Sequence, residues 1–252
     1  MTRAIYFSAT GSTEEIVRDI SGRFSLTYTL LNLTAPLPEG LCIENPDDLV
    51  VIGVPVYAGR VPAPAVASLR KISGRRQNCV LICVYGNRAF DDALLELHDI
   101  AVTQGFRPVG AAAIVARHSI FSKVAATRPD RDDFRVMDDL VTLVRDRLAG
   151  HGKLNAESLP GRFPYKAAGA VPLHPRGSRR KCSKCGVCVD ECPVGAIDKA
   201  TPWVTDDKKC ITCARCISLC RKEARSFGGL LYKIAGWQFE KKNRERRPSM
   251  VF

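Results

Sequence analysis

Apolar and polar residues follow one another along the first 150 residues in blocks that predict alternating strands and helices. The uninterrupted apolar runs at 49–54 and 79–85 indicate strands buried on both faces of a parallel sheet. Helical periodicity, with apolar residues on one face, is found at 14–20, 92–104 and 132–148. The same pattern predicts strands at 3–7, 25–32 and 105–116 and a short helix at 64–72. The fold class expected for residues 1–150 is therefore α/β, with a doubly wound five-stranded parallel sheet.

Three polar or glycine-containing loops follow three of these strands, at 8–13, 55–62 and 85–91. In a doubly wound sheet, ligands bind at the carboxyl ends of the strands, so we expect these loops to converge on one site. The candidate cofactor-binding residues come from these loops: Ser8, Thr10, Gly11, Ser12, Thr13, Pro55, Val56, Tyr57, Ala58, Gly59, Tyr85, Gly86, Asn87, Arg88 and Asp91.

The first loop, between Ser8 and Thr13, joins a predicted strand to a predicted helix and is built from hydroxyl residues and glycine. Backbone N–H groups at such a helix N-terminus bind phosphate. The loop has no lysine, which argues against a P-loop, and no GxGxxG follows a strand, which disfavours a nicotinamide dinucleotide site. Hydroxyls suit a single monophosphate. The alternative is an ordinary helix N-terminus capped by Ser12 or Thr13.

Cysteines carry the most specific motif of the chain. Eight of the 11 occur in two identical CxxCxxCxxxC runs, the second 28 residues after the first. This spacing is typical of proteins with two [4Fe–4S] clusters, in which the fourth cysteine of each run binds the other cluster. The expected ligands are Cys182, Cys185, Cys188 and Cys220 for cluster 1, and Cys210, Cys213, Cys216 and Cys192 for cluster 2. The alternatives are zinc, for which half of the thiols would be surplus, and disulfides, which need no repeat.

Composition divides the chain into two unequal halves. Residues 1–150 hold 17 Lys and Arg against 17 Asp and Glu, whereas residues 151–252 hold 21 against 9 and so account for the net charge of +12. An oxidised cluster with four thiolates carries about −2, so two clusters offset part of this excess. The remainder could steer an acidic partner. The other cysteines, Cys42, Cys79 and Cys83, are expected to be reduced core residues.

The loop Ser8-x-Thr10-Gly11-Ser12-Thr13 resembles the FMN phosphate loop of flavodoxins, and the cysteine runs resemble bacterial-type two-cluster ferredoxins. The flavodoxin resemblance implies strand order 2-1-3-4-5, FMN as cofactor, and a ring flanked by Tyr57 or Tyr85. It also implies that the carbonyl of Gly59 can turn toward the flavin. The second cysteine run departs from the ferredoxin pattern, because Arg221 stands where those proteins usually have proline. The whole chain resembles flavodoxin–ferredoxin fusions of anaerobes.

The expected domains are 1–150 (flavodoxin-like, FMN-binding), 151–177 (linker), 178–228 (a small α+β ferredoxin-like domain) and 229–252 (a basic C-terminal extension with a frayed end). His118 follows the fifth strand and is the candidate catalytic residue, able to supply a proton to a reduced flavin, although an ordinary structural histidine is the simpler interpretation. The catalytic residues are otherwise unknown.

The function expected is that of an electron-transfer iron–sulfur flavoprotein between an external low-potential carrier, two [4Fe–4S] clusters and FMN. The alternatives are an FMN-dependent reductase of a small molecule and a redox-sensing or nucleic-acid-binding protein. The expected partner is a redox protein with an acidic surface, and no nucleic acid is expected. The sequence has no apolar run of 18 residues and no signal-peptide pattern, which favours a cytoplasmic protein without a transmembrane segment. It does not predict the oligomeric state.

Overall fold

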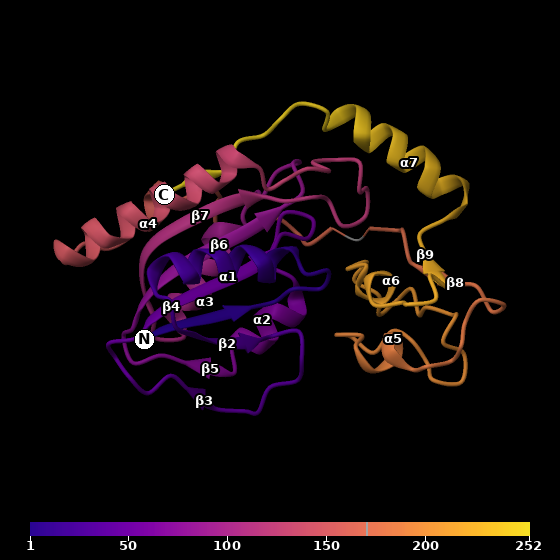
Figure 1. Cartoon of the computed structure of the whole chain (residues 1–252), viewed down its shortest axis with the longest axis horizontal. Helices are drawn as coiled ribbons and strands as arrows, with labels where there is room; N and C mark the ends of the chain where they lie inside the picture. Colours follow the sequence, from indigo (N-terminus) through magenta and orange to yellow (C-terminus); the bar gives the residue numbers. More distant parts are fainter. Residues whose placement is uncertain (170) are drawn as a thin grey trace.

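The computed structural model of the protein describes residues 1–169 and 171–252. Its central feature is a six-stranded sheet in the order β10-β7-β6-β4-β1-β2 (Figure 1). Five strands run parallel, and β10 pairs antiparallel with β7. The strands of this sheet are β1 (Thr2–Tyr6), β2 (Tyr28–Asn32), β4 (Leu49–Pro55), β6 (Asn78–Tyr85), β7 (Arg107–Val115) and β10 (Met250–Val251).

Helices cover both faces of the sheet because alternate side chains of its strands point to opposite sides. Ala4 and Tyr6 pack with α1 (Ser12–Phe24) and α4 (Arg131–Ala149). Ile5 and Phe7 belong to the other core, which includes residues of α2 (Ala63–Leu69) and α3 (Ala93–Thr103). The apolar runs of β4 and β6 are buried on both sides, as expected of central parallel strands.

The parallel part of the sheet confirms the predicted strand order 2-1-3-4-5, with β4, β6 and β7 as the third, fourth and fifth strands. Between β2 and β4, the described chain forms no helix. Instead it carries β3 (Leu41–Cys42), which pairs with β5 (Ile72–Ser73) in a separate small sheet. Cys79 and Cys83 are buried free thiols as expected, whereas Cys42 is only partly buried.

The C-terminal segment differs from the frayed basic tail that the sequence suggested. Lys241 and Lys242 end the helix α7 (Gly229–Lys242), and the chain then returns to the first domain and adds β10 beside β7. In Figure 1 this yellow segment lies along the edge of the sheet next to α4. Short-range patterns missed it because a two-residue strand has no measurable periodicity.

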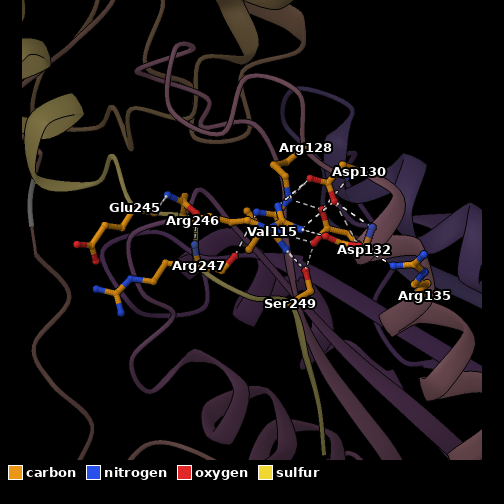
Figure 2. A network of polar contacts seen from close by, with 11 residues as sticks. Val115, Arg128, Asp130, Asp132, Arg135, Glu245, Arg246, Arg247 and Ser249 are labelled. Atoms are coloured by element: carbon orange, nitrogen blue, oxygen red, sulfur yellow. Dashed lines mark hydrogen bonds and ion pairs between the residues drawn. The ribbon is translucent and has the colours of Figure 1, made fainter.

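A polar network fixes this tail where it meets the sheet. Figure 2 shows Arg128, Asp130 and Ser249 gathered at this point. The hydroxyl of Ser249 donates to the Asp133 carboxylate (2.5 Å) and accepts from the Val115 amide (2.9 Å). The Arg128 guanidinium forms a buried ion pair with the same carboxylate. An uncompensated buried charge would be costly, so the tail and the N-terminus of α4 stabilise each other.

The cysteine-rich segment forms a small module beside the sheet domain, drawn in orange in Figure 1. Its regular structure is limited to α5 (Val187–Asp190), α6 (Arg215–Ser218) and the antiparallel pair β8 (Arg176–Gly177) and β9 (Arg225–Ser226). Because the module has so little regular backbone hydrogen bonding, its eight thiols are the main feature that could hold it together.

None of the helices in the described ranges combines the length and apolar composition that crossing a bilayer requires.

The predicted linker, 151–177, lies docked on the first domain, although Ala170 falls outside the described residues. The segment contains a 3-10 turn, Ala156–Ser158. The carboxylate of Asp92 accepts from the amides of Arg162 (3.1 Å) and Lys166 (2.7 Å). These two hydrogen bonds hold this part of the linker against the loop before α3.

Candidate functional site

A cavity of about 500 Å³ lies at the carboxyl ends of the parallel strands. All three predicted loops contribute to its wall. The contributions are Ala9, Thr10, Ser12 and Thr13 from the first loop, Pro55–Gly59 from the second, and Tyr85, Gly86, Arg88 and Ala89 from the third. Further walls come from the segment after β7, the linker, the cysteine module and α7. The volume is in the range of cofactor sites.

The first loop presents the N-terminal turn of α1, whose first amides have no acceptor within the helix. Gly11 precedes the helix with φ of +96°, a conformation that favours glycine. Ser8 is buried outside the cavity wall, where its hydroxyl accepts from the Glu14 amide (3.2 Å). The hydroxyl residues Thr10, Ser12 and Thr13 line the cavity beside these amides, so the loop fits an oxyanion such as a phosphate.

Thr34, a residue that sequence reasoning missed, holds this loop in place. Its hydroxyl accepts from the Ser8 amide (2.9 Å) and donates to the Ser8 carbonyl (3.2 Å). Thr34 follows β2, the neighbour of β1. A search for polar residues after every predicted strand could have found it, because the carboxyl ends of adjacent parallel strands lie together.

The second loop makes a tight turn between Tyr57 and Arg60, whose backbones exchange hydrogen bonds of 3.0 and 3.1 Å. Gly59 has φ of +84°, and a Cβ there would lie 2.0 Å from the Asp91 carboxylate, so glycine is required. The carbonyl of Gly59 accepts from the Asp92 amide (3.1 Å). This oxygen therefore faces the third loop in the structure, and its turn toward a flavin stays a prediction.

Some side chains of the third loop line the cavity, and others contact the C-terminal segment. Gly86 and Arg88 line the cavity, whereas the Asn87 side chain donates to the carbonyls of Asn243 (3.0 Å) and Glu245 (2.8 Å). Asn87 thus anchors the C-terminal segment, and the cavity lining does not include it. Asp91 also lies outside the cavity wall, where its carboxylate pairs with Arg88 and with Lys166 (2.8 Å).

Both candidate stacking residues contribute to the cavity wall. The Tyr85 ring packs edge-on against Phe90, and its hydroxyl donates to the Pro248 carbonyl (2.7 Å). Tyr57 packs against the core of the first domain near Cys213. Burial, and to a smaller degree the nearby Cys213 side chain, raises the pKa of Tyr57 well above its usual value. Both phenols therefore stay neutral near pH 7.

His118 lies in the cavity wall between the third loop and α7. A Cβ on Gly86 would be 2.5 Å from the His118 ring, and the Phe239 ring packs edge-on at 4.7 Å. The amides of Ile120 and Phe121 both donate to Nδ1 at 3.1 Å, which leaves the proton on Nε2. Burial, assisted by Arg88, lowers the pKa of His118 to about 4. The imidazole is thus neutral near pH 7 and offers a hydrogen bond rather than an acidic proton.

The eight cysteines of the two runs gather around two separate hollows. An outer hollow of about 470 Å³ is lined by Cys182, Cys185, Cys188 and Cys220. A narrow inner hollow of about 20 Å³ is lined by Cys192, Cys210, Cys213 and Cys216. In both cases the fourth cysteine of one run joins three cysteines of the other, which is the grouping expected from the sequence. Among the described residues, no three His, Cys, Asp or Glu side chains are close enough to hold one metal ion.

The two runs repeat their backbone conformation as well as their spacing. Lys184 and Thr212, 28 positions apart, both have positive φ (+56° and +58°), and their amides donate to the sulfurs of Cys182 and Cys210 at 3.4 Å. The amides of Ala196 and Ala224 donate likewise to the fourth cysteine of each run, at 3.3 and 3.2 Å. Amides that point at sulfur stabilise thiolates. The local fold is thus prepared for anionic ligands at both hollows.

Arg225 is a buried cation near both sets of cysteines. Its side chain bonds to the Pro175 carbonyl (3.2 Å), the Pro202 carbonyl and the Thr205 hydroxyl, and Nε has no partner in the described chain. No carboxylate pairs with it among the described residues. A buried guanidinium needs compensating negative charge. Anionic iron–sulfur centres would provide it, so the donor set fits iron–sulfur ligation.

Buried thiols in this module resist ionisation when no metal is bound. Burial raises the pKa of Cys213 to about 12, although the Arg215 backbone amide opposes this effect. Burial also raises the pKa of Cys188, Cys210 and Cys216. Metal binding would displace these protons, because coordination stabilises the thiolate directly.

The inner hollow adjoins the cavity at the strand ends. Ile211, between Cys210 and Cys213, lines both spaces. Cys213 belongs to the same hydrophobic core as β4 and β6, and Tyr57 packs against that core. The outer hollow shares no lining residue with the cavity. The inner cysteine set is therefore the one next to the candidate cofactor site.

Arg215 connects the cysteine module to the first loop and was not anticipated from the sequence. Its Nη1 donates to the carbonyls of Ser8 (3.3 Å) and Ala9 (3.4 Å). Its Nε donates to the carbonyl of Glu191 (3.0 Å), and its Nη2 pairs with the carboxylate of that residue. Glu191 directly precedes Cys192, so one guanidinium joins the first loop to both runs that supply the inner hollow.

Comparison with known proteins agrees with this organisation. The family described as a 4Fe-4S binding domain (Fer4) matches residues 178–198. No curated protein matches the chain.

Several solved structures are similar to part of this chain. Flavodoxin 1 from Bacillus cereus is 15% identical (TM-score 0.44), the match covering 57% of this chain and 97% of that one. The Fusobacterium nucleatum flavodoxin bound to flavin mononucleotide is 18% identical (TM-score 0.42), with 58% and 98% covered. The rubredoxin oxygen:oxidoreductase from Desulfovibrio gigas is 14% identical (TM-score 0.41), with 59% and 36% covered, so this chain spans about a third of that protein.

The strand order and the matched cysteine domain together define the class of the protein. It joins a flavodoxin-like α/β domain to a 4Fe–4S binding domain. This combination is that of an iron–sulfur electron-transfer protein.

Proposed function

We propose that the chain carries electrons between an external low-potential carrier and FMN by way of two [4Fe–4S] clusters. The observation that carries this proposal is the position of Ile211, which lines both the inner cysteine hollow and the cavity at the strand ends. An outer cluster would exchange electrons with the partner, and an inner cluster would exchange them with the flavin. The direction of flow is left to experiment.

We assign Cys182, Cys185, Cys188 and Cys220 to the outer cluster and Cys192, Cys210, Cys213 and Cys216 to the inner one. The two hollows, the amides donated to sulfur and the buried Arg225 support this assignment. Protein purified anaerobically should contain about eight iron and eight inorganic sulfide per chain. About four iron would contradict the two-cluster proposal while leaving a single 4Fe–4S centre.

We assign FMN to the cavity, with its phosphate at Thr10, Ser12 and Thr13. When bound, FMN supplies a centre that can exchange two electrons in single steps. The chain's own part is to bind the phosphate with the first turn of α1, to exclude water with α7 and the linker, and to keep His118 and both tyrosines neutral. Extraction should release FMN; FAD, or no flavin, would contradict the assignment.

Thr13→Val offers a sharper test of the phosphate site. Thr13 is buried and lines the cavity, so loss of its hydroxyl should weaken FMN binding about tenfold. Thr142→Val is the matched control, because Thr142 is exposed on α4 and its hydroxyl bonds only to the Asp138 carbonyl (3.1 Å). Equal FMN dissociation constants in the two variants would place the phosphate elsewhere.

The surroundings of the cavity favour electron transfer over direct reduction of a small substrate. The cysteine module contributes Ile211 and Thr212 to the wall, the linker contributes Lys166 and Val171, and α7 contributes Phe239. A substrate would compete with these segments for the space beside the flavin.

The domain boundaries that we propose remain 1–150, 151–177, 178–228 and 229–252. Within the last segment, strand β10 pairs with the sheet of the first domain.

The basic run at residues 176–181, directly before Cys182, fits local charge compensation better than nucleic-acid binding. The Arg179 guanidinium and the Lys184 ammonium lie over the Trp203 ring, at 5.3 and 5.8 Å from its centre. Trp203 lines the outer cysteine hollow. These cations therefore lie beside the proposed outer cluster, where they offset its charge and favour an acidic partner.

A further inference from the structure

Helix α7 carries apolar side chains on two opposite faces. Its inner face packs against the first domain, with Tyr232 stacked on Phe121 (ring centres 5.6 Å apart) and Phe239 beside it at 4.8 Å. Its outer face presents Leu230, Ile234 and Trp237, which are spaced as successive turns of one helix stripe. A helix that only covers a protein surface normally has polar residues on its outer side.

The outer face is strongly exposed. The side chains of Leu230, Leu231, Ile234 and Trp237 are 73%, 59%, 47% and 64% accessible. Together they form a ridge at the periphery of the molecule, where Figure 1 shows α7 lying outside both the sheet domain and the cysteine module. Leu231 also lines the cavity at the strand ends. The side chains of Leu230 and Ile234 face solvent, so the outer part of the ridge lies at the surface. Contiguous apolar surface of this kind marks an interaction site.

A basic hollow of about 620 Å³ begins where the ridge ends. Trp237 lines it together with Lys123, Lys241 and Arg244. The Lys241 ammonium lies 5.4 Å from the centre of the Trp237 ring, so the aromatic residue stands at the boundary between apolar and cationic surface. Lys123, Lys241 and Arg244 form no ion pair within the described chain, and their charges face solvent.

The acidic residues of the hollow do not cancel this charge. The Asp130 carboxylate is engaged by the Arg246 guanidinium at 2.7 and 2.9 Å, and Glu240 is the other carboxylate in the lining. Within the described residues, the cations Lys123, Lys241 and Arg244 therefore have only the Glu240 carboxylate to balance them. The hollow suits a phosphate group, which lysine and arginine bind through charge-assisted hydrogen bonds.

We propose that the outer face of α7 and its basic hollow bind the surface of an anionic phospholipid membrane. Leu230, Ile234 and Trp237 would enter the boundary between headgroups and acyl chains. The hollow would receive lipid phosphates. Aliphatic residues, an interfacial tryptophan and flanking lysines are the features that hold a helix in the plane of a membrane surface. This inference goes beyond electron transfer and does not depend on which cofactors are bound.

Two other occupants fit the surface less well. A second copy docking through the same face would bring two basic hollows together, with repulsion between like charges. An acidic protein would satisfy the hollow, but a projecting ridge of leucine and isoleucine is not the concave pocket in which protein anchors are buried. An anionic bilayer can contact the apolar ridge with its acyl chains and the basic hollow with its phosphates at the same time.

The test is co-sedimentation of the anaerobically purified full-length protein with phospholipid vesicles. Equimolar phosphatidylglycerol and phosphatidylcholine should bind the protein, pure phosphatidylcholine should bind it at least about tenfold more weakly, and added salt should release it. Lys241→Gln should weaken binding to the anionic vesicles about fivefold. At matched ionic strength, inorganic phosphate should displace the protein no more than chloride does, because the ridge contributes to binding only at a membrane.

The ridge itself is tested by Ile234→Glu and Leu230→Gln, which should each reduce vesicle binding at least about tenfold. Leu26→Glu is the matched control, since Leu26 is a leucine with 98% exposure elsewhere in the fold, and it should bind as the unmodified protein does. Circular dichroism verifies that each variant is folded.

Three results would overturn the proposal. The first is equal binding to both vesicle compositions, or binding to neither. The second is full binding by folded Ile234→Glu and Leu230→Gln variants. The third is a dimer in solution that Ile234→Glu dissociates while vesicles fail to bind, which would assign the ridge to a second copy of the chain.

Discussion

The two halves of this protein are organised by different forces. The sheet domain is charge-balanced, with 17 basic and 17 acidic residues in 1–150, and two continuous apolar cores flank its parallel strands. The cysteine module has two four-residue helices and one pair of two-residue strands. It belongs to residues 151–252, which account for the net charge of +12. Hydrophobic burial holds the first half, and metal ligation is expected to hold the second. The two halves should therefore unfold under different conditions, the module on loss of iron and the sheet domain on disruption of its buried contacts.

Removal of iron should produce the largest effect and should separate the two halves completely. The module from 178 to 228 has little core of its own, so without metal its amides should lose protection from hydrogen exchange. The sheet domain should keep its protection. Exchange measured by mass spectrometry, before and after anaerobic chelation, tests this. A module that stays protected without iron would show that packing, not ligation, holds it.

Asp133→Ala should destabilise only the sheet domain, by about 3–5 kcal/mol, because Arg128 would be left buried without its partner. The Ser249 hydroxyl would lose its acceptor as well, which loosens β10. Urea unfolding of the holoprotein measures the change. Asp138→Ala removes an exposed ion pair with Arg23 and should cost less than about 1 kcal/mol. Similar losses in both variants would contradict the buried role of Asp133.

The sheet domain should also lose stability in mild acid through His118. Folding lowers the pKa of this imidazole from 6.5 to about 4, mainly by burial and secondly through Arg88. Between these values the unfolded chain binds more protons, so stability is complete above pH 6.5 and falls as the pH decreases toward 4. The loss is about 2 kcal/mol, allowing for partial solvent exposure.

His118→Gln should remove this pH slope, whereas replacement of the exposed His151 should leave it unchanged. The comparison needs the free energy of unfolding at several pH values between 4 and 7. An identical slope in the His118 variant and the unmodified protein would assign the acid sensitivity to other groups.

Arg215→Gln should act on the junction between the halves, with the smallest effect of the series. Loss of the guanidinium frees the Ser8 and Ala9 carbonyls, and FMN binding should weaken about tenfold, or roughly 1.4 kcal/mol. Arg176→Gln is the control, because the Arg176 guanidinium bonds to Thr205 and Asp207 in the module and not to the first loop. Flavin titration of the apoprotein measures both. Equal affinities would mean that the module does not position the first loop.

Much of the sheet domain could be predicted from local patterns. The apolar runs at 49–54 and 79–85 gave strands near their observed bounds, because strands buried on both faces need no polar alternation. The spacing of the cysteines likewise predicts a grouping of thiols, and the linings of the two hollows have the same grouping. Both patterns can be read from short stretches of sequence. The apolar runs reflect burial of the strands, and the cysteine spacing reflects ligation of metal.

The parts that were missed depend on contacts between distant segments. Asn87 lies in a loop that converges on the cavity, yet its side chain holds the tail at 243–247. Arg215 is one of many basic residues in its region, and only the docked module shows that it reaches the first loop. Sequence position indicates which residues are near a site, but the direction of each side chain is decided by its partners.

The central claim is that the inner cysteine set adjoins the flavin and the outer set does not. Electron paramagnetic resonance of the flavin radical tests it, because a nearby paramagnetic cluster speeds the relaxation of that radical. Relaxation should stay fast in a Cys182→Ser/Cys185→Ser variant, which lacks the outer cluster. It should become slow in a Cys192→Ser/Cys216→Ser variant, which lacks the inner one. Slow relaxation in the first variant and fast relaxation in the second would contradict the account.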